Sequence, residues 1–244
     1  MTIEAFVFDA YGTLYDVHSV SQLTEEEFPG RGDLITQIWR LKQLEYTWLR
    51  SQMQVYRDFW EVSEESLVYT LKAIGLSTDK VVVNRILDKY LHLDPYPDCL
   101  SALDALKGYP LAILSNGNQE ILDKLVKNTG LDTRLQSVIS VDKVKTFKPH
   151  PTAYELVEQT LGIKPENVMF VSSNSFDATA AKNFGFQVAW IERVTPEALA
   201  AEVASQEVVG PSTMFKLLRM QLENFGMEPD HRLTSLSDLA SLIK

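Results

Sequence analysis

The fold of this chain is decided at residues 3–14, which read IEAFVFDAYGTL. The apolar run over residues 3–8 predicts a buried strand that ends directly at Asp9. A carboxylate in that place is costly to remove from water, so it needs a hydrogen-bonding partner or has a task. Gly12 permits a tight loop, and Thr13 offers a hydroxyl and a backbone N–H that can turn back onto Asp9. Taken alone, such an Asp is more often a capping residue than a catalytic one.

The pattern of a short apolar run that ends at polar residues recurs four more times along the chain. The runs are residues 111–114, 138–141, 168–171 and 188–191, and helical patterns follow most of them. Strand, turn and helix repeated in this way predict an α/β fold, with a Rossmann-like, mostly parallel sheet between layers of helices. Ligands bind beyond the carboxyl ends of the strands in such sheets, so functional residues are expected there.

The texture of the sequence changes between residues 16 and 95. This stretch has almost no strand signal and predicts helices over about 32–54, 63–74 and 77–91. The chain then returns through Asp94-Pro-Tyr-Pro97, which is a turn signal. We therefore expect a core domain of residues 1–15 and 96–244, and an inserted helical cap subdomain of residues 16–95 with hinges near Tyr15 and Tyr96.

The C-terminal part carries no visible chemistry. An amphipathic helix is predicted by Met214, Leu217, Leu218, Leu222 and Phe225, and a final strand end and helix by residues 233–243. The amphipathic helix fits a core element, a surface addition or an oligomer contact, and the sequence leaves these alternatives open.

Composition excludes several classes of partner. The formal net charge of −10 argues against nucleic acid and against an anionic membrane surface. An anionic substrate then needs Lys and Arg side chains concentrated locally. The single cysteine, Cys99, rules out an internal disulfide and fits a reducing cytoplasm. The first ten residues show no basic leader and no membrane-spanning run, so a cytoplasmic protein is expected.

Four strand ends together resemble the motifs of the haloacid dehalogenase superfamily. Residues 9–14, DAYGTL, resemble its first motif, DxxGT[LV]. Ser115 matches the second motif, Lys148 the third and Asp177 the fourth, in the order that the superfamily has them. Each match is weak alone, since a Ser at a strand end is usually a cap and a Lys in a loop is usually solvated. The resemblance covers roughly residues 3–193.

Two positions separate this chain from the phosphatases of that superfamily. Phosphatases carry a second Asp two residues after the nucleophile, which protonates the leaving alcohol and helps to bind Mg²⁺. Here that position is Tyr11, whose ordinary pKa of ~10 makes it a poor acid. Ser173 stands where the fourth motif has its first Asp, so the oxygen-rich Mg²⁺ site is incomplete. A carbon–halogen substrate needs neither group because halide leaves unprotonated, and we expect no cofactor and no metal.

The helix expected after residue 32 also favours the dehalogenases over the phosphatases of the superfamily. Residues 38–51, IWRLKQLEYTWLRS, are similar to the L-2-haloacid dehalogenases. That resemblance implies a halide cradle made by Arg40, Asn116 and the aromatic Phe59. A lone Arg on a helix is usually solvated, but here apolar neighbours surround Arg40.

The resemblance implies hydrolysis of short L-2-haloacids to D-2-hydroxy acids through an aspartyl ester. Asp9 attacks C2, while Lys148 and Ser115 hold its carboxylate ionised and oriented. Asp177 then activates water, which Ser172 and Asn174 position. Ser115 and the backbone N–H groups of residues 116–118 receive the substrate carboxylate.

The residues expected to carry catalysis are Asp9, Thr13, Arg40, Ser115, Lys148, Tyr154, Ser172, Asn174 and Asp177. The residues expected to line the substrate site are Tyr11, Leu41, Leu44, Phe59, Ser115, Asn116 and Phe176. Tyr154 either reaches Lys148 or Asp9 or is simply buried in a helix face. The family often has Trp at Phe176 and a polar residue at Leu41, and these departures predict an altered substrate preference.

Two alternatives accompany this prediction. The first is a small-metabolite phosphatase of the same superfamily, which would require Mg²⁺. The second is a binding protein that keeps the fold without catalysis. Retention of Asp9, Lys148 and Asp177 argues against the second. The resemblance also implies a homodimer that acts on a small 2-haloalkanoate substrate.

Overall fold

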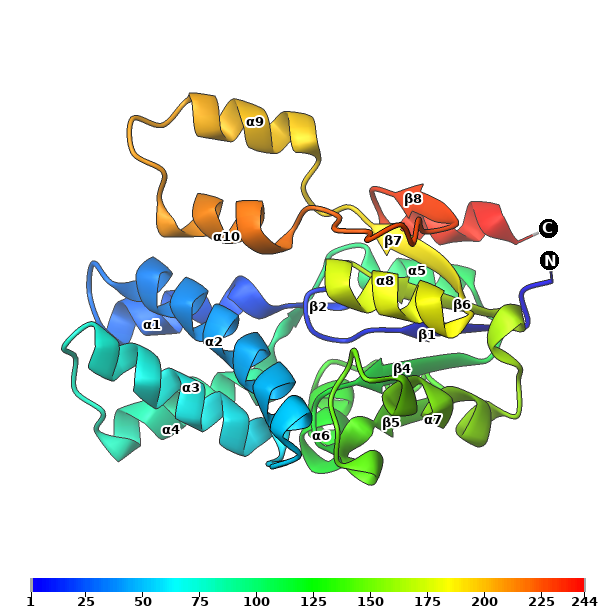
Figure 1. Ribbon diagram of the computed structural model, residues 1–244, viewed down its shortest axis with the longest axis horizontal. Helices are drawn as coiled ribbons and strands as arrows, with labels where there is room; N and C mark the ends of the chain where they lie inside the picture. The colour runs from blue at the N-terminus through cyan, green and yellow to red at the C-terminus, as the bar shows by residue number, and fades with distance from the viewer. Residues whose placement is uncertain (1, 244) are drawn as a thin grey trace.

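The computed structural model describes residues 2–243 and has a parallel six-stranded sheet at its centre, as predicted (Figure 1). The strand order is β5-β4-β1-β6-β7-β8. Their bounds are Ala5–Phe8 (β1), Leu111–Ser115 (β4), Ser137–Ser140 (β5), Val168–Ser172 (β6), Gln187–Ile191 (β7) and His231–Leu233 (β8). Because β1 lies between β4 and β6, Asp9 stands at the middle of the carboxyl edge of the sheet.

Helices cover both faces of this sheet. Those of the core are α5 (Cys99–Ala105), α6 (Gln119–Asn128), α7 (Pro151–Leu161) and α8 (Ser175–Phe184). In Figure 1, α5 lies behind the sheet and α8 in front of it. The central strands are therefore buried on both sides, and every residue of β1, β4, β6 and β7 is buried. This burial is the reason that these strands read as continuous apolar runs and do not alternate.

Four helices lie between β1 and α5 in the sequence. They are α1 (Ser21–Glu27), α2 (Gly32–Met53), α3 (Phe59–Ala73) and α4 (Lys80–Asp88). Figure 1 shows them gathered beyond the carboxyl ends of the strands, opposite to the two ends of the chain. The short strands β2 (Tyr15–Asp16) and β3 (Asp94–Pro95) pair antiparallel, so the chain leaves for these helices and returns from them at one place.

Local signals explain where some helix ends differ from prediction. The helix expected from residue 63 begins at Phe59, because Asp58 and Glu61 form a reciprocal capping box at its N-terminus. The helix expected over residues 77–91 ends at Asp88 and continues as the 3₁₀ turn Lys89–His92. The short helix α1 carries too weak a pattern to be predicted.

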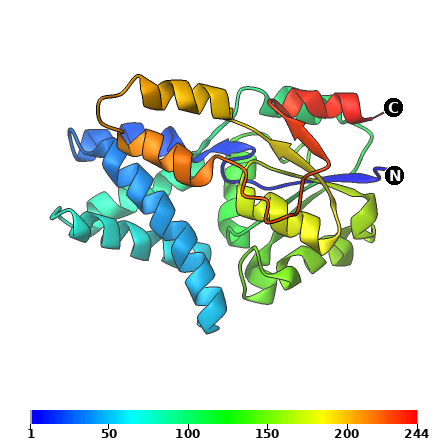
Figure 2. The same ribbon diagram turned by 45° about the horizontal axis from the view of Figure 1, so that its top comes forward.

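The prediction of one amphipathic helix over residues 214–225 is wrong about where that helix begins and ends. The structure has α10 at Pro211–Arg219, with Pro at its first position. Residues 221–230 are not helical, and a 3₁₀ helix follows at Leu236–Leu242. Phe225 has a left-handed backbone with a φ of 45°. A further helix, α9 (Pro196–Ala204), precedes it, and Figure 2 shows α9 and α10 together as an excursion from the end of β7. Across residues 2–243, no helix combines the length and the apolarity needed to cross a membrane.

Candidate active site

Asp9 is buried at the end of β1, and three donors hold its carboxylate. Lys148 Nζ lies 2.7 Å from Oδ1, while Thr13 Oγ1 and Asn174 Nδ2 donate to Oδ2 at 3.0 and 2.7 Å. Gly12 turns the loop with a φ of 93°, a backbone conformation that other residues rarely adopt. These three hydrogen bonds hold the carboxylate in one orientation.

Lys148 joins Asp9 to a second carboxylate, that of Asp177. Its Nζ lies 2.7 Å from Asp177 Oδ2 and donates to the carbonyl of Leu114 at 3.0 Å, so all three of its donor positions are used. Burial alone would lower the pKa of Lys148, but Asp177 and Asp9 outweigh burial and raise it. The ammonium therefore stays charged between the two carboxylates.

Asp177 is fully buried near the start of α8, and both of its oxygens are engaged. Tyr154 Oη donates to Oδ1 at 2.7 Å, and Ser172 Oγ donates to Oδ2 at 3.1 Å. Burial raises the pKa of Asp177 to about 6, and Asp9 acts in the same direction while Lys148 opposes it. Burial and the nearby Asp177 also raise the pKa of Tyr154, so the phenol keeps its proton. An Asp in this setting can accept a proton near neutral pH.

The loop after β6 is tied to the loop after β1. Asn174 donates through Nδ2 to the carbonyl of Tyr11 at 2.9 Å as well as to Asp9. The backbone N–H of Ser173 donates to Thr13 Oγ1 at 2.9 Å, and the N–H of Asn174 donates to Ser172 Oγ at 3.1 Å. These bonds fix the residues around Asp9 relative to one another.

Ser115 and Asn116 lie on the opposite side of Asp9, at the end of β4. Ser115 Oγ accepts from the N–H of Gly117 at 3.2 Å, and the expected bond between Ser115 and Asp9 is not found among residues 2–243. Asn116 Oδ1 accepts from the backbone N–H of Lys148 at 2.8 Å, which leaves its amide NH₂ for a ligand. Asn118 caps α6 by accepting from the N–H of Ile121.

The helices above the sheet contribute a buried cation and a group of aromatic rings. Arg40 on α2 is 5% exposed and donates to Gln43 Oε1 at 2.7 Å. Phe59 stacks on Tyr11 with 5.1 Å between ring centroids, and burial raises the pKa of Tyr11 well above its usual value. Tyr11 Oη has no hydrogen-bond partner among the described residues. A phenol in this state is no proton donor for a leaving group.

Of the other predicted substrate residues, Leu44 and Phe176 lie beside Asn174. Leu44 is buried on α2, and Leu41 is half-buried one residue beyond Arg40. Phe176 at the start of α8 packs edge to face against Trp48, with 5.2 Å between ring centroids. Leu44, Asn174 and Phe176 line one small recess.

Three further residues contact this site and were not predicted. Gln43 holds Arg40 and donates to Ser63 Oγ at 2.6 Å. Tyr90 donates to Gln43 Oε1 at 3.2 Å. Arg193, just after β7, donates to the carbonyl of Thr13 at 2.8 Å. Only Arg193 had a usable signal, because it also follows a predicted strand.

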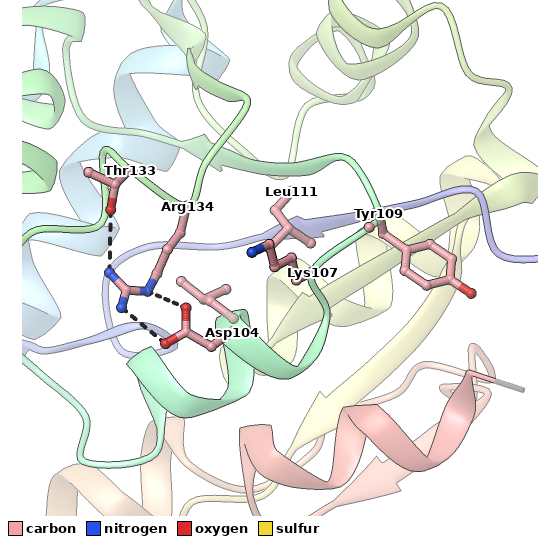
Figure 3. Close-up of a pocket in the computed structure, with 8 residues that line it drawn as sticks. Asp104, Lys107, Tyr109, Leu111, Thr133 and Arg134 are labelled. Carbon is pink, nitrogen blue, oxygen red and sulfur yellow. Dashed lines mark hydrogen bonds and ion pairs between the residues drawn. The ribbon is translucent and has the colours of Figure 1, made fainter.

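The described residues hold no metal cluster, and a hollow at the other end of the sheet differs in kind from this site. Within residues 2–243, no three His, Cys, Asp or Glu side chains come together so as to hold a metal ion. A separate hollow of about 270 Å³ lies at the amino end of β4, where Leu111 begins the strand (Figure 3). Its Arg134 is already paired with Asp104 at 2.8 Å, so this hollow is not a site of the same kind.

Comparison with known proteins shows what the chain is similar to. A family model described as haloacid dehalogenase-like hydrolase matches residues 3–185. The chain is 50% identical to the (S)-2-haloacid dehalogenase of Xanthobacter autotrophicus over 242 residues, which covers 99% of this chain and 95% of that protein. It is 49% identical to (S)-2-haloacid dehalogenase H-109 of Pseudomonas putida over 193 residues, or 78% of this chain and 86% of that one.

Solved structures agree with these sequence matches. The L-2-haloacid dehalogenase from Xanthobacter autotrophicus with chloropropionic acid covalently bound superposes with a TM-score of 0.95 at 50% identity. The match covers 99% of this chain and 98% of that one. The similarity therefore includes the helices α1–α4, α9 and α10 as well as the sheet.

Proposed function

This chain belongs to the haloacid dehalogenase-like hydrolase family, and from that premise we propose that it is a hydrolytic (S)-2-haloacid dehalogenase. It converts short L-2-haloacids to D-2-hydroxy acids and halide. The observation that carries this proposal is the buried carboxylate of Asp9 between Lys148 and Asn174, with the phenol of Tyr11, whose pKa burial raises, in place of a second acid. Halide needs no proton in order to leave.

In the first step, an oxygen of Asp9 attacks C2 of the substrate. A C–O bond forms as the carbon–halogen bond breaks, the configuration at C2 inverts, and the halide takes the bonding electron pair. Lys148 and Thr13 hold the Asp9 carboxylate in a fixed orientation, so little of the barrier is spent on positioning it. The product of this step is an ester between Asp9 and the acid.

The leaving halide is received by Arg40, Asn116 and Phe59. Arg40 is buried, and its guanidinium bonds to neutral partners, Gln43 and Tyr90. The amide NH₂ of Asn116 is oriented by the bond from Lys148 N–H to its oxygen. A guanidinium that is held in place without a counter-charge stabilises the negative charge that develops on the halogen.

The substrate carboxylate is received at the end of β4. Ser115 and the backbone N–H groups of residues 116–118 lie just before α6, whose N-terminus favours an anion. Tyr11, Leu41, Leu44, Phe59 and Phe176 enclose the carbon chain. This apolar enclosure favours small 2-haloalkanoates.

In the second step, water attacks the ester carbonyl of Asp9. Asp177 takes a proton from the water, the acyl C–O bond breaks, and Asp177 returns the proton to the released oxygen of the 2-hydroxy acid. Ser172 and Asn174 position the water, while Tyr154 and Lys148 orient Asp177. No cofactor or metal takes part in either step.

Halide release from racemic 2-chloropropionate in the presence of EDTA tests this proposal, with Asp9→Asn run in parallel. We expect the unmodified enzyme to release halide from one enantiomer and Asp9→Asn to release none. Hydrolysis of phosphate esters that requires Mg²⁺ would indicate the phosphatase alternative. A protein inactive in both assays would be a non-catalytic binding member of the family.

We further propose that residues 16–95 act as a cap over the core formed by residues 1–15 and 96–244. The paired strands β2 and β3 support this division, since a cap joined at one place can move over Asp9. Limited proteolysis with and without substrate tests it. Faster cleavage near residues 16 and 95 in the free enzyme is expected.

We also propose a homodimer that works in the cytoplasm. Met214, Leu217 and Leu218 on α10 are 45%, 43% and 49% exposed, which gives an apolar surface suited to a second copy. The buried free thiol of Cys99 suits a reducing compartment. Light scattering tests the dimer, and fractionation of the source cells tests the location.

A further inference from the structure

Two guanidinium groups line one small hollow beside the Asp9 loop. The hollow has a volume of about 20 Å³, and its lining includes Gly12, His18, Arg40, Asn174, Phe215 and Arg219. Arg40 comes from α2, and Arg219 is the last residue of α10. Helix α10 packs against α2, as Figures 1 and 2 both show, so the two cations approach the hollow from different elements.

Neither cation has a carboxylate partner. Within residues 2–243, no Asp or Glu oxygen lies within 4.0 Å of Arg40 or Arg219, whereas the nearby Arg193 pairs with Asp98 at 2.9 Å. Arg219 lies over the ring of Trp48, 5.0 Å from its centroid, and its Nε is buried without a partner. Like charges at one poorly solvated hollow repel each other, and a small anion between them would offset that repulsion.

His18 adds another polar atom without a partner. Its Nδ1 is buried and makes no hydrogen bond among the described residues, and its ring packs edge to face on Phe215 at 4.9 Å. Burial lowers the pKa of His18, so the ring is neutral and keeps one N–H. A neutral imidazole N–H is a donor for an anion.

The hollow continues towards the surface. An outer hollow of about 430 Å³ shares His18, Tyr96, Phe215 and Met220 with the inner one. It is also lined by Asp16 and by Lys216, which pairs with Glu202 at 2.8 Å. Phe215 and Arg219 are one helical turn apart, so α10 turns both towards this route while Leu217 and Leu218 point outward. The two hollows are therefore neighbours, with Arg40 and Arg219 lining the inner one.

We propose that Arg219, together with Arg40 and His18, forms a relay site for the halide displaced from the substrate, which leaves the enzyme beneath α10. This inference rests on the proposed dehalogenase function, because that function supplies the halide. A hollow of this size holds about one water-sized particle, which suits a monatomic anion better than a 2-haloacid. The relay site would give α10 a role in product release, although the sequence of this helix shows no catalytic motif.

Halide binding can be measured without turnover through Trp48. The substrate-free enzyme is titrated with sodium bromide at constant ionic strength while tryptophan fluorescence is recorded. We expect saturable quenching, and Arg219→Met should weaken the apparent bromide affinity by about tenfold, as for the loss of one charge-assisted contact. Arg219→Lys should keep most of the affinity, and Trp48→Phe should remove the quenching signal.

The matched control is Arg232→Met, which removes the same charge from an exposed site paired with Glu228. Its bromide titration should equal that of the unmodified enzyme. If Arg219→Met binds bromide as Arg232→Met does, the relay site is wrong. Circular dichroism establishes whether each variant is folded. If Arg219→Met does not fold, Arg219→Gln is titrated in its place.

Turnover of 2-bromopropionate separates this inference from the proposed function. With Arg219→Met, we expect an unchanged rate of ester formation and weaker inhibition by added bromide. A raised KM with unchanged bromide inhibition would assign Arg219 to substrate entry and overturn the relay. Absence of halide release by the unmodified enzyme would overturn the dehalogenase function, whereas its bromide titration would still report on the site itself.

Discussion

Tyr154 Oη donates a hydrogen bond to Asp177 Oδ1 at 2.7 Å, which fixes the carboxylate proposed to activate water. The other oxygen, Oδ2, accepts from Lys148 and Ser172. Asp177 is thus held by donors on both oxygens although it has no exposure to solvent. Its hydrogen bond from Tyr154 opposes the effect of burial on the pKa of Asp177, which connects Tyr154 to the second chemical step.

Tyr154→Phe is expected to slow ester hydrolysis more than ester formation. Loss of the hydrogen bond frees Asp177 to reorient and raises its pKa further, so kcat should fall by about tenfold or more. Rapid-quench measurement of the ester and of released halide separates the two steps. Tyr109→Phe, far from Asp9 at the amino end of β4, serves as the control. If ester formation and ester hydrolysis slow equally, Tyr154 does not act through Asp177 alone.

The pH dependence of kcat should show an acidic limb set by Asp177. Burial raises the pKa of this carboxyl to about 6, so the ionised base is lost as the pH falls below that value. With hydrolysis limiting, kcat should fall about tenfold for each pH unit below the limb. Steady-state rates in a three-buffer series measure it, and Tyr154→Phe should move the limb to higher pH. If the acidic limb stays at the same pH in Tyr154→Phe, the limb does not report the ionisation of Asp177.

The sheet and the strand-end residues could be predicted because each depends on a local pattern. An apolar run that ends at Asp9 or Ser115 is visible in a few residues, and a parallel sheet brings such ends to one edge. The position of Lys148 between Asp9 and Asp177 lies beyond periodicity, but the order of the family motifs indicates that the three act together. The strand ends can therefore be recognised from a few neighbouring residues, and the role of Lys148 from the order of the motifs.

Other contacts depend on tertiary packing between distant elements. Tyr154 fits a buried helix face as well as a hydrogen bond, and nothing near it in the sequence indicates Asp177. Arg219 reaches the Asp9 loop only because α10 folds back onto α2. The helix over residues 211–219 was expected to run further, since Leu222 and Phe225 continue its apolar spacing by chance. Long-range packing of this kind is not encoded in a short window.

Lys148→Met should destabilise the fold as well as abolish activity. The substitution leaves two buried carboxylates side by side without a cation, for which we expect a loss of about 3–5 kcal/mol in the free energy of unfolding at about pH 8. Burial raises the pKa of Asp177 and Lys148 opposes that effect, so without Lys148 the folded state holds a proton on Asp177 more tightly than the unfolded state does. The deficit should therefore shrink as the pH is lowered to about 5.5.

Urea unfolding of the unmodified protein and Lys148→Met at both pH values measures this deficit. The double variant Lys148→Met with Asp177→Asn is the control, because it removes one of the two uncompensated charges. It should recover part of the lost stability at the higher pH. A deficit that is independent of pH and unrelieved in the double variant would mean that packing, and not charge, accounts for the effect.

Asp9 should acquire oxygen from water before the product does. In a single turnover with excess enzyme in H₂¹⁸O, the oxygen that attacks C2 is one of the two already on Asp9, and it leaves with the 2-hydroxy acid. Water then replaces it at the Asp9 carbonyl carbon, so mass spectrometry should find the label in the peptide that contains Asp9 and none in the first product. Asp177 only accepts a proton and should remain unlabelled. Direct attack of water on C2 would give the reverse distribution, with labelled product and an unlabelled Asp9, and would exclude the ester intermediate.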